Sequence, residues 1–367
     1  MKIKLLLSGI CIGLCFAGAN AQDAPKEHLK SLSAEGIDNS ISPKKDFYSH
    51  VNKKWMEDHP LSAEYSRYGQ FNILNDSSNN RVRRIVAGLA ATNPAPGTDA
   101  YKIATLYEAG MDSVRRNALG ATPIKKDLAK IENTPASGMT DLFLWMHKNY
   151  SSPLVDIAPM EDLANSNEYA MYVSGAGLGL GDRDYYLLND KRNKDVRTAY
   201  TKLIETVMQL AGYSKKDAKR IAKNVLKIET LIADSTWTRE ESRNIPAMYN
   251  PRSIAQLKET YPAFPWDRFF VETMGIQTPE MFIVATPNTV LQGNALMNSL
   301  TDREKKDLYL WEYVSSAAPF LSDDFADASF EFQKVLSGVE QQHPRWKKAL
   351  GTTEGIMGEG IGKLYVE

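Results

Sequence analysis

An arginine set among aromatic residues is the strongest candidate for chemistry in this chain. Arg67 lies between Tyr65 and Tyr68 in the stretch YSRYG, directly before Gly69. A guanidinium presents its N–H donors in one plane and binds a carboxylate through two parallel hydrogen bonds. The pattern therefore predicts a site that binds a carboxylate group.

The histidines are not spaced for a metal site. Two histidines one helical turn apart, as in HExxH, bring both imidazoles to one metal ion. No two histidines here are three or four residues apart, and His59 and His343 each precede a proline, which disfavours a helical conformation. Glu108 and Asp112 form an ExxxD pattern that we interpret as surface carboxylates. We expect no metal ligand among the five histidines, which are His28, His50, His59, His147 and His343.

A glycine-rich run, SGAGLGLGDRDYYL from Ser174 to Leu187, invites comparison with nucleotide-binding loops. Its glycines follow a GxGxGxG pattern and not GxGxxG, and DRDYYLLND is a poor start for the helix that a phosphate loop needs behind it. The run therefore indicates a turn region packed through its backbone. The sequence also lacks a GxSxG motif and a Walker lysine, so serine catalysis and phosphate-loop chemistry have no support.

Helical periodicity dominates from Asp46 onward. Apolar residues recur every three or four positions over 196–210 and 218–232, which predicts two helices that pair antiparallel, with Gly212 ending the first. Thr301 and Glu304 have the spacing of a capping box. Short apolar runs that begin at Pro153, Glu168 and Met281 are the strand candidates. The predicted fold class is mainly α with a few short β strands.

The N-terminus predicts export. Two lysines, an apolar run from Leu5 to Ala17, and Ala19-Asn20-Ala21 have the form of a signal peptide cleaved after Ala21, so residues 1–21 are predicted to be removed. The apolar run is too short for a stable membrane anchor, and both cysteines lie inside it. The formal net charge of −1 gives no indication of a nucleic-acid partner. We expect a secreted or periplasmic protein.

Seven blocks, in order along the chain, resemble the neprilysin and endothelin-converting-enzyme family of zinc metallopeptidases, specifically its N-terminal region. The departures are small: Gly181 stands where a proline is usual, and the cysteines of animal members are absent. The blocks are DFYSHVNKKW at Asp46, YSRYGQFNIL at Tyr65, KIATLYEAGMD at Lys102, GLGLGDRDYYL at Gly177, YNPRSIAQL at Tyr249, RWKKAL at Arg345 and GEGIGKLYVE at Gly358.

The resemblance implies a multi-helical, neprilysin-like N-terminal (cap) domain and, in the full-length enzyme, hydrolysis of small peptides with zinc as cofactor. The zinc ligands of that family lie in HExxH and a later ExxxD segment, beyond the GxLYVE block at which this chain stops. We therefore expect a truncated chain that binds no zinc itself and is inactive alone, with peptide substrates and a missing C-terminal catalytic domain as partners.

The resemblance also implies two substrate-binding residues. Arg67 matches the family arginine in SRYG that binds the C-terminal carboxylate of the substrate. Asn72 occupies the position at which an acidic residue contributes in some members. No catalytic residue and no metal ligand of the family has a counterpart in this chain.

The expected organisation has four parts. After the signal peptide, residues 22–42 form a flexible lead, 43–75 pack with the catalytic domain, and 76–367 form the helical cap domain. An apolar stripe of Met357, Ile361 and Leu364 is expected to be covered by that same catalytic part. Each such side chain left bare forfeits about 1.5–3 kcal/mol of burial.

Three functions are compatible with the sequence. The first is the N-terminal part of a secreted zinc metalloendopeptidase. The second is a catalytically inactive peptide-binding module that retains Arg67, and the third is a helical envelope protein with a structural role. Peptide binding that depends on Arg67 distinguishes the first two from the third.

Overall fold

The computed structural model describes residues 34–366. The predicted signal peptide, 1–21, and the first part of the predicted lead lie outside the described residues. The described chain forms two compact units: residues 34–61 with 68–72, and residues 62–67 with 73–366. The boundary that the sequence predicts between 43–75 and 76–367 stays a prediction.

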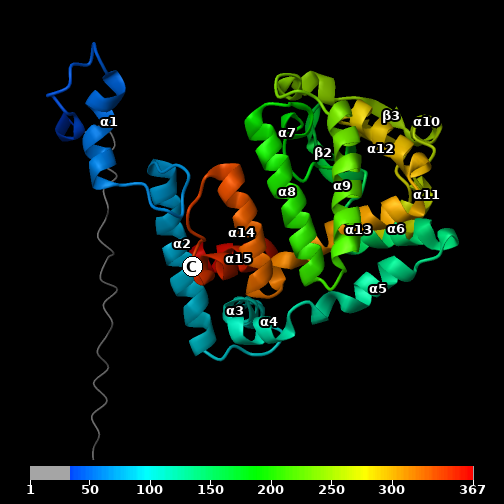
Figure 1. Cartoon of the computed structure of the whole chain (residues 1–367), viewed down its shortest axis with the longest axis horizontal. Coiled ribbons are helices and arrows are strands. Elements are labelled where there is room, and N and C mark those ends of the chain that lie inside the picture. Colours follow the sequence, from blue (N-terminus) through cyan, green and yellow to red (C-terminus); the bar gives the residue numbers. More distant parts are fainter. Residues whose placement is uncertain (1–33, 367) are drawn as a thin grey trace, which may run out of the picture. The chain divides into compact units, whose positions relative to one another are not determined.

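The described chain is mainly helical, as the sequence predicts (Figure 1). The predicted pair of antiparallel helices corresponds to α8 and α9, which pack against each other. The α-helices are α1 (Phe47–Asp58), α2 (Gln70–Ala91), α3 (Asp99–Met111), α4 (Ser113–Leu119), α5 (Lys125–Asn133), α6 (Met139–Asn149), α7 (Asp184–Leu187), α8 (Lys191–Leu210), α9 (Lys215–Ser235), α10 (Ile254–Thr260), α11 (Trp266–Arg268), α12 (Pro287–Ser299), α13 (Asp302–Ala317), α14 (Asp323–Ser337) and α15 (Arg345–Val366).

One small mixed sheet accompanies the helices, with strand order β1-β2-β4-β3. The strands are β1 (Val155–Asp162), β2 (Asn165–Gly175), β3 (Pro251–Ser253) and β4 (Met281–Val284). Strands β1 and β2 form an antiparallel hairpin, β2 runs parallel to β4, and β3 runs antiparallel to β4. The three strand candidates are confirmed. Strand β3 was missed because three residues are too few to show an alternating pattern.

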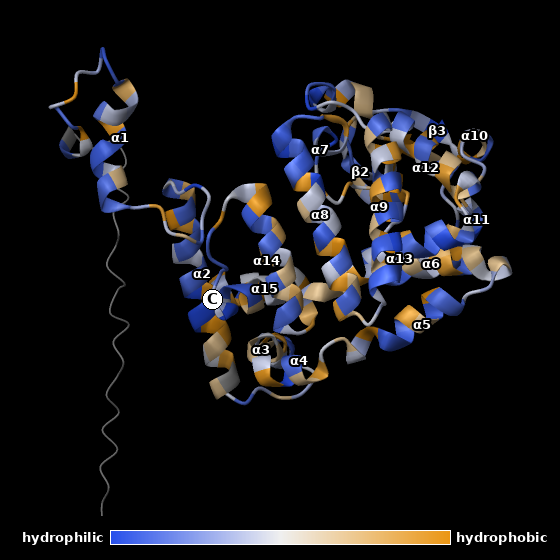
Figure 2. Ribbon diagram, in the orientation of Figure 1, coloured by the Kyte–Doolittle hydropathy of each residue, from blue (hydrophilic) through white to orange (hydrophobic). Residues whose placement is uncertain are grey.

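Helix ends follow the local signals. Thr301 accepts a hydrogen bond from the Glu304 backbone N–H and Glu304 returns one to Thr301, which is the predicted capping box of α13. Gly212, after α8, has a φ of +102°, a left-handed conformation that glycine adopts without strain. In Figure 2, α8 and α9 each carry hydrophobic and hydrophilic residues in alternation along the ribbon, as expected for helices with one buried side.

The first unit contains α1 and the segments on either side of it. Asp46 caps α1 by accepting a hydrogen bond from the Ser49 backbone N–H. At the other end His59 stacks on Trp55, with ring centroids 4.7 Å apart. No residue of α1 is fully buried, and Phe47 is 68% exposed. Its predicted apolar face therefore contributes little core of its own.

The second unit has two main apolar cores, a larger and a smaller one, and a third, separate cluster of Tyr172, Ile283 and Ala285. The larger core joins α5, α6, α8, α9, α12 and α13 with one face of the sheet. The smaller core lies between α2, α3 and α15 and contains Val82, Val86, Ile103 and Tyr107. Close packing of α3 on α15 requires Gly110, because a Cβ there would lie 2.8 Å from that of Ala349.

The expectation that the apolar stripe of α15 needs a cover from outside this chain is wrong. Ile361 is 3% exposed, and Met357 and Leu364 are partly buried against the smaller core. The partners are helices α2 and α3, which lie far earlier in the sequence. The exposed apolar residues of α15 are instead Ile356, Tyr365 and Val366.

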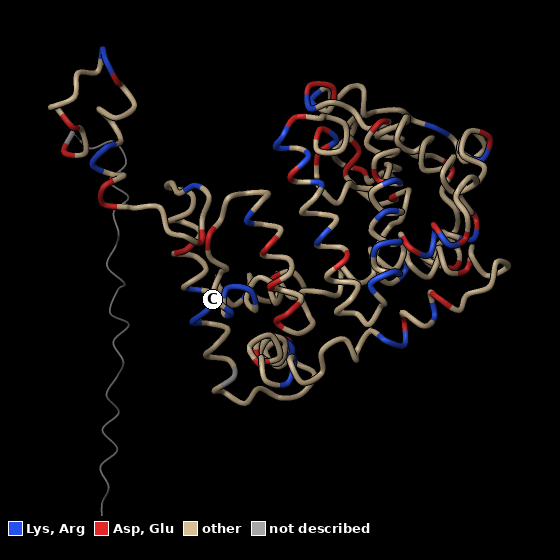
Figure 3. The backbone as a smooth tube through the Cα atoms, viewed as in Figure 1, with Lys and Arg blue, Asp and Glu red and all other residues tan. Residues whose placement is uncertain are grey.

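Charges of both signs are interspersed along the helices (Figure 3). Between residues 34 and 366, no helix combines the length and the apolar character needed to cross a bilayer.

A buried carboxyl group holds together several elements of the larger core. Glu229 on α9 is 5% exposed and accepts hydrogen bonds from the hydroxyls of Tyr186, at 2.8 Å, and Tyr200, at 3.0 Å. Trp311 on α13 donates its indole N–H to the Tyr200 hydroxyl at 3.0 Å. Burial raises the pKa of Glu229 to about 7, although hydrogen bonds from Tyr186, Tyr200 and the Gly179 backbone oppose the rise.

The glycine-rich run is a backbone-packed region, as predicted. A Cβ on Gly179 would lie 2.8 Å from Glu229 Oε1 and closer still to the Tyr200 hydroxyl, so only glycine lets this backbone approach the carboxyl group. Gly181 has a φ of +74°, which proline cannot adopt. The departure from the family pattern at Gly181 therefore matches the local backbone.

Gly179→Ala is expected to destabilise the protein by about 1–3 kcal/mol, because the added methyl group would overlap the Tyr200 hydroxyl and crowd Glu229. Urea unfolding followed by circular dichroism measures the change. Gly177→Ala is the matched control, since a Cβ at Gly177 has nothing within 4 Å. Equal stabilities for the two variants would show that the close contact of the Gly179 backbone with Tyr200 and Glu229 does not contribute to stability.

Glu229→Gln is expected to reduce the loss of stability as pH rises from about 4.5 to about 7. The folded-state pKa of Glu229 is about 7, above its unfolded value. As pH rises, the unfolded state therefore releases this proton before the folded state does. The free energy of unfolding falls over that pH range, by at most about 1.4 kcal/mol per pH unit. The free energies of unfolding of variant and wild type are measured at pH 5 and pH 8.

Because burial also raises the pKa of Glu312 to about 7, only the difference between variant and wild type reports on Glu229. The control is Glu331→Gln, which removes an exposed carboxyl group from α14 and leaves the cluster intact. Parallel pH profiles for Glu229→Gln and wild type would contradict the assignment.

Candidate functional site

The segment Ser62–Arg67 carries the predicted carboxylate-binding arginine. Arg67 is exposed and makes no hydrogen bond or ion pair with another residue in the described part of the chain. The cation that lies over the Tyr65 ring is Lys347, 5.2 Å from the ring centroid. Arg67 is therefore not stacked on Tyr65, and its guanidinium edge is available to a ligand.

A polar network fixes this segment to α15 and α2. Lys347 on α15 donates to the Tyr65 hydroxyl at 3.0 Å, to Asp76 Oδ1 at 2.9 Å and to Glu64 Oε2 at 3.3 Å. The Tyr65 hydroxyl also donates to Asp76 at 2.6 Å. On the other side, the backbone N–H groups of residues 340 and 341 donate to the carbonyl of Ala63. The residues just before Arg67 are thus bonded to α15, to α2 and to the backbone of residues 340 and 341.

The pKa shifts show that the network favours its charged forms. Burial alone would lower the pKa of Lys347, but its hydrogen bonds to Tyr65 and Asp76 outweigh burial and raise the pKa above its usual range. Burial would raise the pKa of Glu64, but hydrogen bonds from His343 and Lys347 outweigh it and lower the pKa. The segment is consequently held by charged hydrogen bonds at neutral pH.

Asn72, the second predicted substrate-binding residue, has a local structural contact. Its side-chain oxygen accepts a hydrogen bond from the Gly69 backbone N–H at 3.0 Å, and the Asn72 backbone N–H donates to the Gly69 carbonyl at 2.9 Å. These two bonds close the first turn at the start of α2. The Asn72 amide N–H donors have no protein partner among the described residues.

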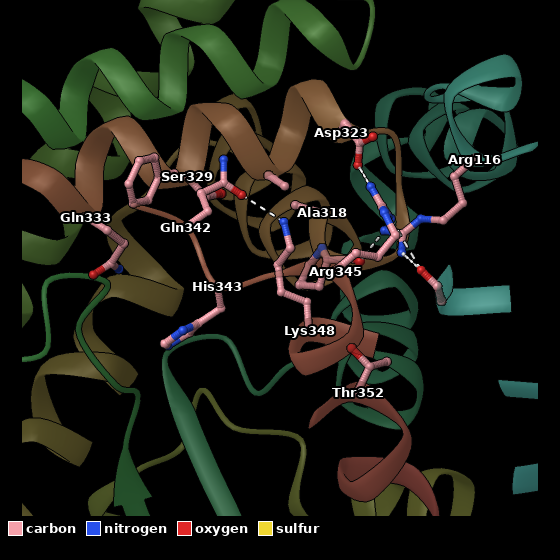
Figure 4. Close-up of a pocket in the computed structure, with 14 residues that line it drawn as sticks. Arg116, Ala318, Asp323, Ser329, Gln333, Gln342, His343, Arg345, Lys348 and Thr352 are labelled. Carbon is pink, nitrogen blue, oxygen red and sulfur yellow. Dashed lines mark hydrogen bonds and ion pairs between the residues drawn. The ribbon is translucent and has the colours of Figure 1, made fainter. Parts of the chain in front are cut away.

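A pocket of about 380 Å³ lies between α14 and α15 (Figure 4). His343 lines this pocket and also bonds to Glu64 at 3.0 Å, so the pocket wall and the segment that carries Arg67 share a contact. Charged side chains on the wall are Arg116 from α4, Asp323 from α14, and Arg345 and Lys348 from α15.

Two of these arginines connect helices. Arg116 donates to the backbone carbonyls of Leu321 and Pro319, at 2.7 Å and 2.6 Å, and of Gly110 at 3.2 Å. Arg345 donates to the Gly110 carbonyl at 3.3 Å and pairs with Asp323. Their guanidinium groups therefore join α3 and α4 to α14 and α15.

The described histidines contact backbone carbonyls, aromatic rings and, in the case of His343, a carboxylate. His50 bonds to the backbone carbonyls of Asp38 and Ile41, and His147 lies among the rings of Phe143, Phe264 and Phe269. His28 lies outside the described residues. Asp112, from the ExxxD pattern, caps α4. Between residues 34 and 366, no group of three or more His, Cys, Asp or Glu side chains could hold a metal ion, so these residues do not fit a zinc site.

Sequence reasoning missed the residues that hold the site. The RWKKAL block contains Arg345, Lys347 and Lys348, yet the sequence assigns no partner to any of them. Their partners lie on α2, α14 and the segments before them. The signal available was a run of three cations within four residues, which by itself indicates only a charged helix face.

Comparison with known proteins places these features in a family. The model of the N-terminal part of peptidase family M13 matches residues 43–367. Endothelin-converting enzyme 1 is 27% identical over 352 residues in Rattus norvegicus, which covers 92% of this chain and 46% of that protein. The Homo sapiens protein of that name is 28% identical over 353 residues, covering 92% and 45%.

A solved structure shows the same fold. The Mycobacterium tuberculosis zinc metalloprotease Zmp1 in complex with an inhibitor superposes with a TM-score of 0.83 at 27% identity, over 92% of this chain and 51% of that one. The chain spans about half the length of the curated relatives it matches. On the family match over residues 43–367 and on this common fold, the chain belongs to peptidase family M13, as its N-terminal region.

Proposed function

We propose that this chain is the N-terminal, peptide-binding part of a secreted zinc metalloendopeptidase whose full-length form hydrolyses small peptides. Membership of peptidase family M13 supports the proposal, as does the likeness to endothelin-converting enzyme 1 and to the zinc metalloprotease Zmp1 over about half of each protein. Zinc is the proposed cofactor of the full-length enzyme. Because residues 34–366 do not fit a zinc site, the proposed source of the metal ligands is a C-terminal catalytic domain.

The main support for a peptide-binding role of this chain is that the Arg67 guanidinium is exposed and has no partner among the described residues. An exposed arginine normally moves freely, but the residues before Arg67 are fixed by Glu64, Tyr65 and their bonds to Lys347. A fixed backbone reduces the backbone part of the conformational entropy lost when a ligand binds, so that mainly the Arg67 side chain has to be ordered. The proposed ligand group is the C-terminal carboxylate of a peptide, held through two parallel hydrogen bonds.

Asn72 is the second proposed substrate-binding residue, on the resemblance alone. Its side-chain oxygen is engaged by the Gly69 N–H, so only its amide N–H groups are available to a substrate. Such donors suit a peptide carbonyl or carboxylate.

Arg67→Ala is expected to weaken binding of a short peptide with a free C-terminus at least ten-fold, because a charge-assisted hydrogen bond is worth about 1.5–3 kcal/mol. Isothermal titration calorimetry of the full chain measures the affinity. The affinity of Arg67→Lys for the peptide is expected to lie between those of the wild type and Arg67→Ala, since an ammonium keeps the charge but cannot form two parallel hydrogen bonds.

Two controls make the Arg67 experiment specific. Arg84→Ala removes another exposed arginine, from α2, and is expected to bind as the wild type does. The same peptide with an amidated C-terminus is expected to bind the wild type and Arg67→Ala with equal, weaker affinity. If the free and amidated peptides bind the wild type equally, Arg67 does not recognise a carboxylate.

Export to the periplasm or the medium is the proposed location. When the whole gene is expressed in a bacterium with a Sec pathway, the mature protein is expected to begin at Gln22. N-terminal sequencing of the periplasmic fraction and the medium checks this. Ala19→Arg, which removes a small residue that the peptidase requires, is expected to leave the chain uncleaved; a wild-type protein that keeps Met1 in the cytoplasm would refute the proposal.

A further inference from the structure

The pocket between α14 and α15 carries more positive than negative charge. Three cationic side chains line it, namely Arg116, Arg345 and Lys348, against the single carboxylate of Asp323. Asp323 is paired with Arg345. Asp327 stands outside the lining, where it accepts a hydrogen bond from Gln342 at 2.7 Å. The wall thus has two cations, Arg116 and Lys348, that form no ion pair with a lining carboxylate.

Arg116 is bound by three backbone carbonyls, whereas Lys348 has only one neutral partner. Its ammonium donates to the side-chain oxygen of Gln342 at 2.8 Å, and no carboxylate among the described residues lies within 4.0 Å of it. Partial burial lowers the pKa of Lys348, and repulsion from Arg345 and Arg116 lowers it further, while Asp323 and Asp327 oppose this. Two of the three ammonium donors remain for a ligand.

The remaining wall is partly apolar. Ala318, Ala326 and Phe330 supply carbon surface, while Ser329, Gln333 and Thr352 supply polar groups. In the view of Figure 4, Lys348 lies between Arg345 on one side and Gln333 and His343 on the other. A volume of about 380 Å³ falls in the range of small-molecule sites. An apolar wall beside a free cation suits a ligand with a carboxylate and an adjoining apolar group.

The arginines of this pocket have a structural explanation that Lys348 lacks. Arg116 and Arg345 direct their guanidinium groups to backbone carbonyls and Asp323, and so connect α3 and α4 to α14 and α15. Those contacts account for both charges without a ligand. Lys348 connects only to a neutral amide six residues away, which a glutamine or methionine at position 348 could do without adding charge.

We infer that this pocket is a second carboxylate-binding site, separate from Arg67, which takes a carboxylate joined to an apolar group through the ammonium of Lys348. The ligand chemistry has two possible sources, the C-terminal residue of a peptide or a free aromatic carboxylate. Arg116 and Arg345 supply a positive field, and Lys348 supplies the direct contact.

The test uses the full chain and two probes, N-acetylphenylalanine and 3-phenylpropionate, with affinities measured by calorimetry. Lys348→Gln is expected to weaken both probes at least ten-fold, whereas Lys348→Arg stays within about three-fold of the wild type because it keeps the charge. Lys363→Gln, an exposed lysine on the same helix, is the matched control and is expected to bind as the wild type does.

The outcomes separate this inference from the role of Arg67. Binding lost in Lys348→Gln and kept in Arg67→Ala supports the second site; the reverse pattern places the carboxylate at Arg67 and overturns the inference alone. N-acetylphenylalaninamide, which lacks the charge, is expected to bind at least ten-fold more weakly than the acid. Stronger binding of N-acetylphenylalanine than of 3-phenylpropionate identifies a peptide C-terminus as the source, and equal binding a free carboxylate. No binding of either acid to the wild type also overturns the inference.

Discussion

The burial of one carboxyl group constrains much of the larger core. Glu229 on α9 accepts hydrogen bonds from Tyr186 on α7 and Tyr200 on α8, and Trp311 on α13 reaches the Tyr200 hydroxyl. A carboxyl group placed in a core without such donors costs several kcal/mol, so these aromatic residues must surround it once α9 brings it inside. The same requirement explains Gly179, because only a backbone without a side chain can add its N–H to the set.

Helix α15 has a comparable position in the smaller core. Its apolar side packs on α2 and α3, its Lys347 fixes the segment before Arg67, and its Arg345 bonds to Gly110 and Asp323. These contacts lie on different sides of α15, so together they fix its rotation about its own axis: a rotation that shortened one contact would break the others. The segment that carries Arg67 and the wall of the pocket are therefore both positioned by the part of α15 that precedes the non-helical residue Met357, and rigid elements position side chains more accurately than loops do.

The sequence predicts what is local and misses what is distant. Periodicity, Gly212 and the Thr301–Glu304 box place α8, α9 and α13, because each signal lies within a few residues of the end it specifies. The stripe around Ile361 was assigned to an outside partner, since nothing local shows that Ile103 and Val86 cover it. The proposed role of Arg67 comes from its motif and stays a prediction. Lys347, which pairs with Glu64 and Asp76, was not predicted, because ion pairs between residues this far apart in the sequence follow no spacing rule.

Arg345 and Lys348 lie within one turn of α15, but only the charge of Arg345 is neutralised by a protein partner. They lie three residues apart on the same side of α15, so both face α14. A planar guanidinium can satisfy a carbonyl and a carboxylate at once, and Arg345 does so. An ammonium has no such fork, and Lys348 is left with a neutral amide beside two like charges. Asp323 and Asp327 partly offset the repulsion from these two charges, and an anion in the pocket would offset it further.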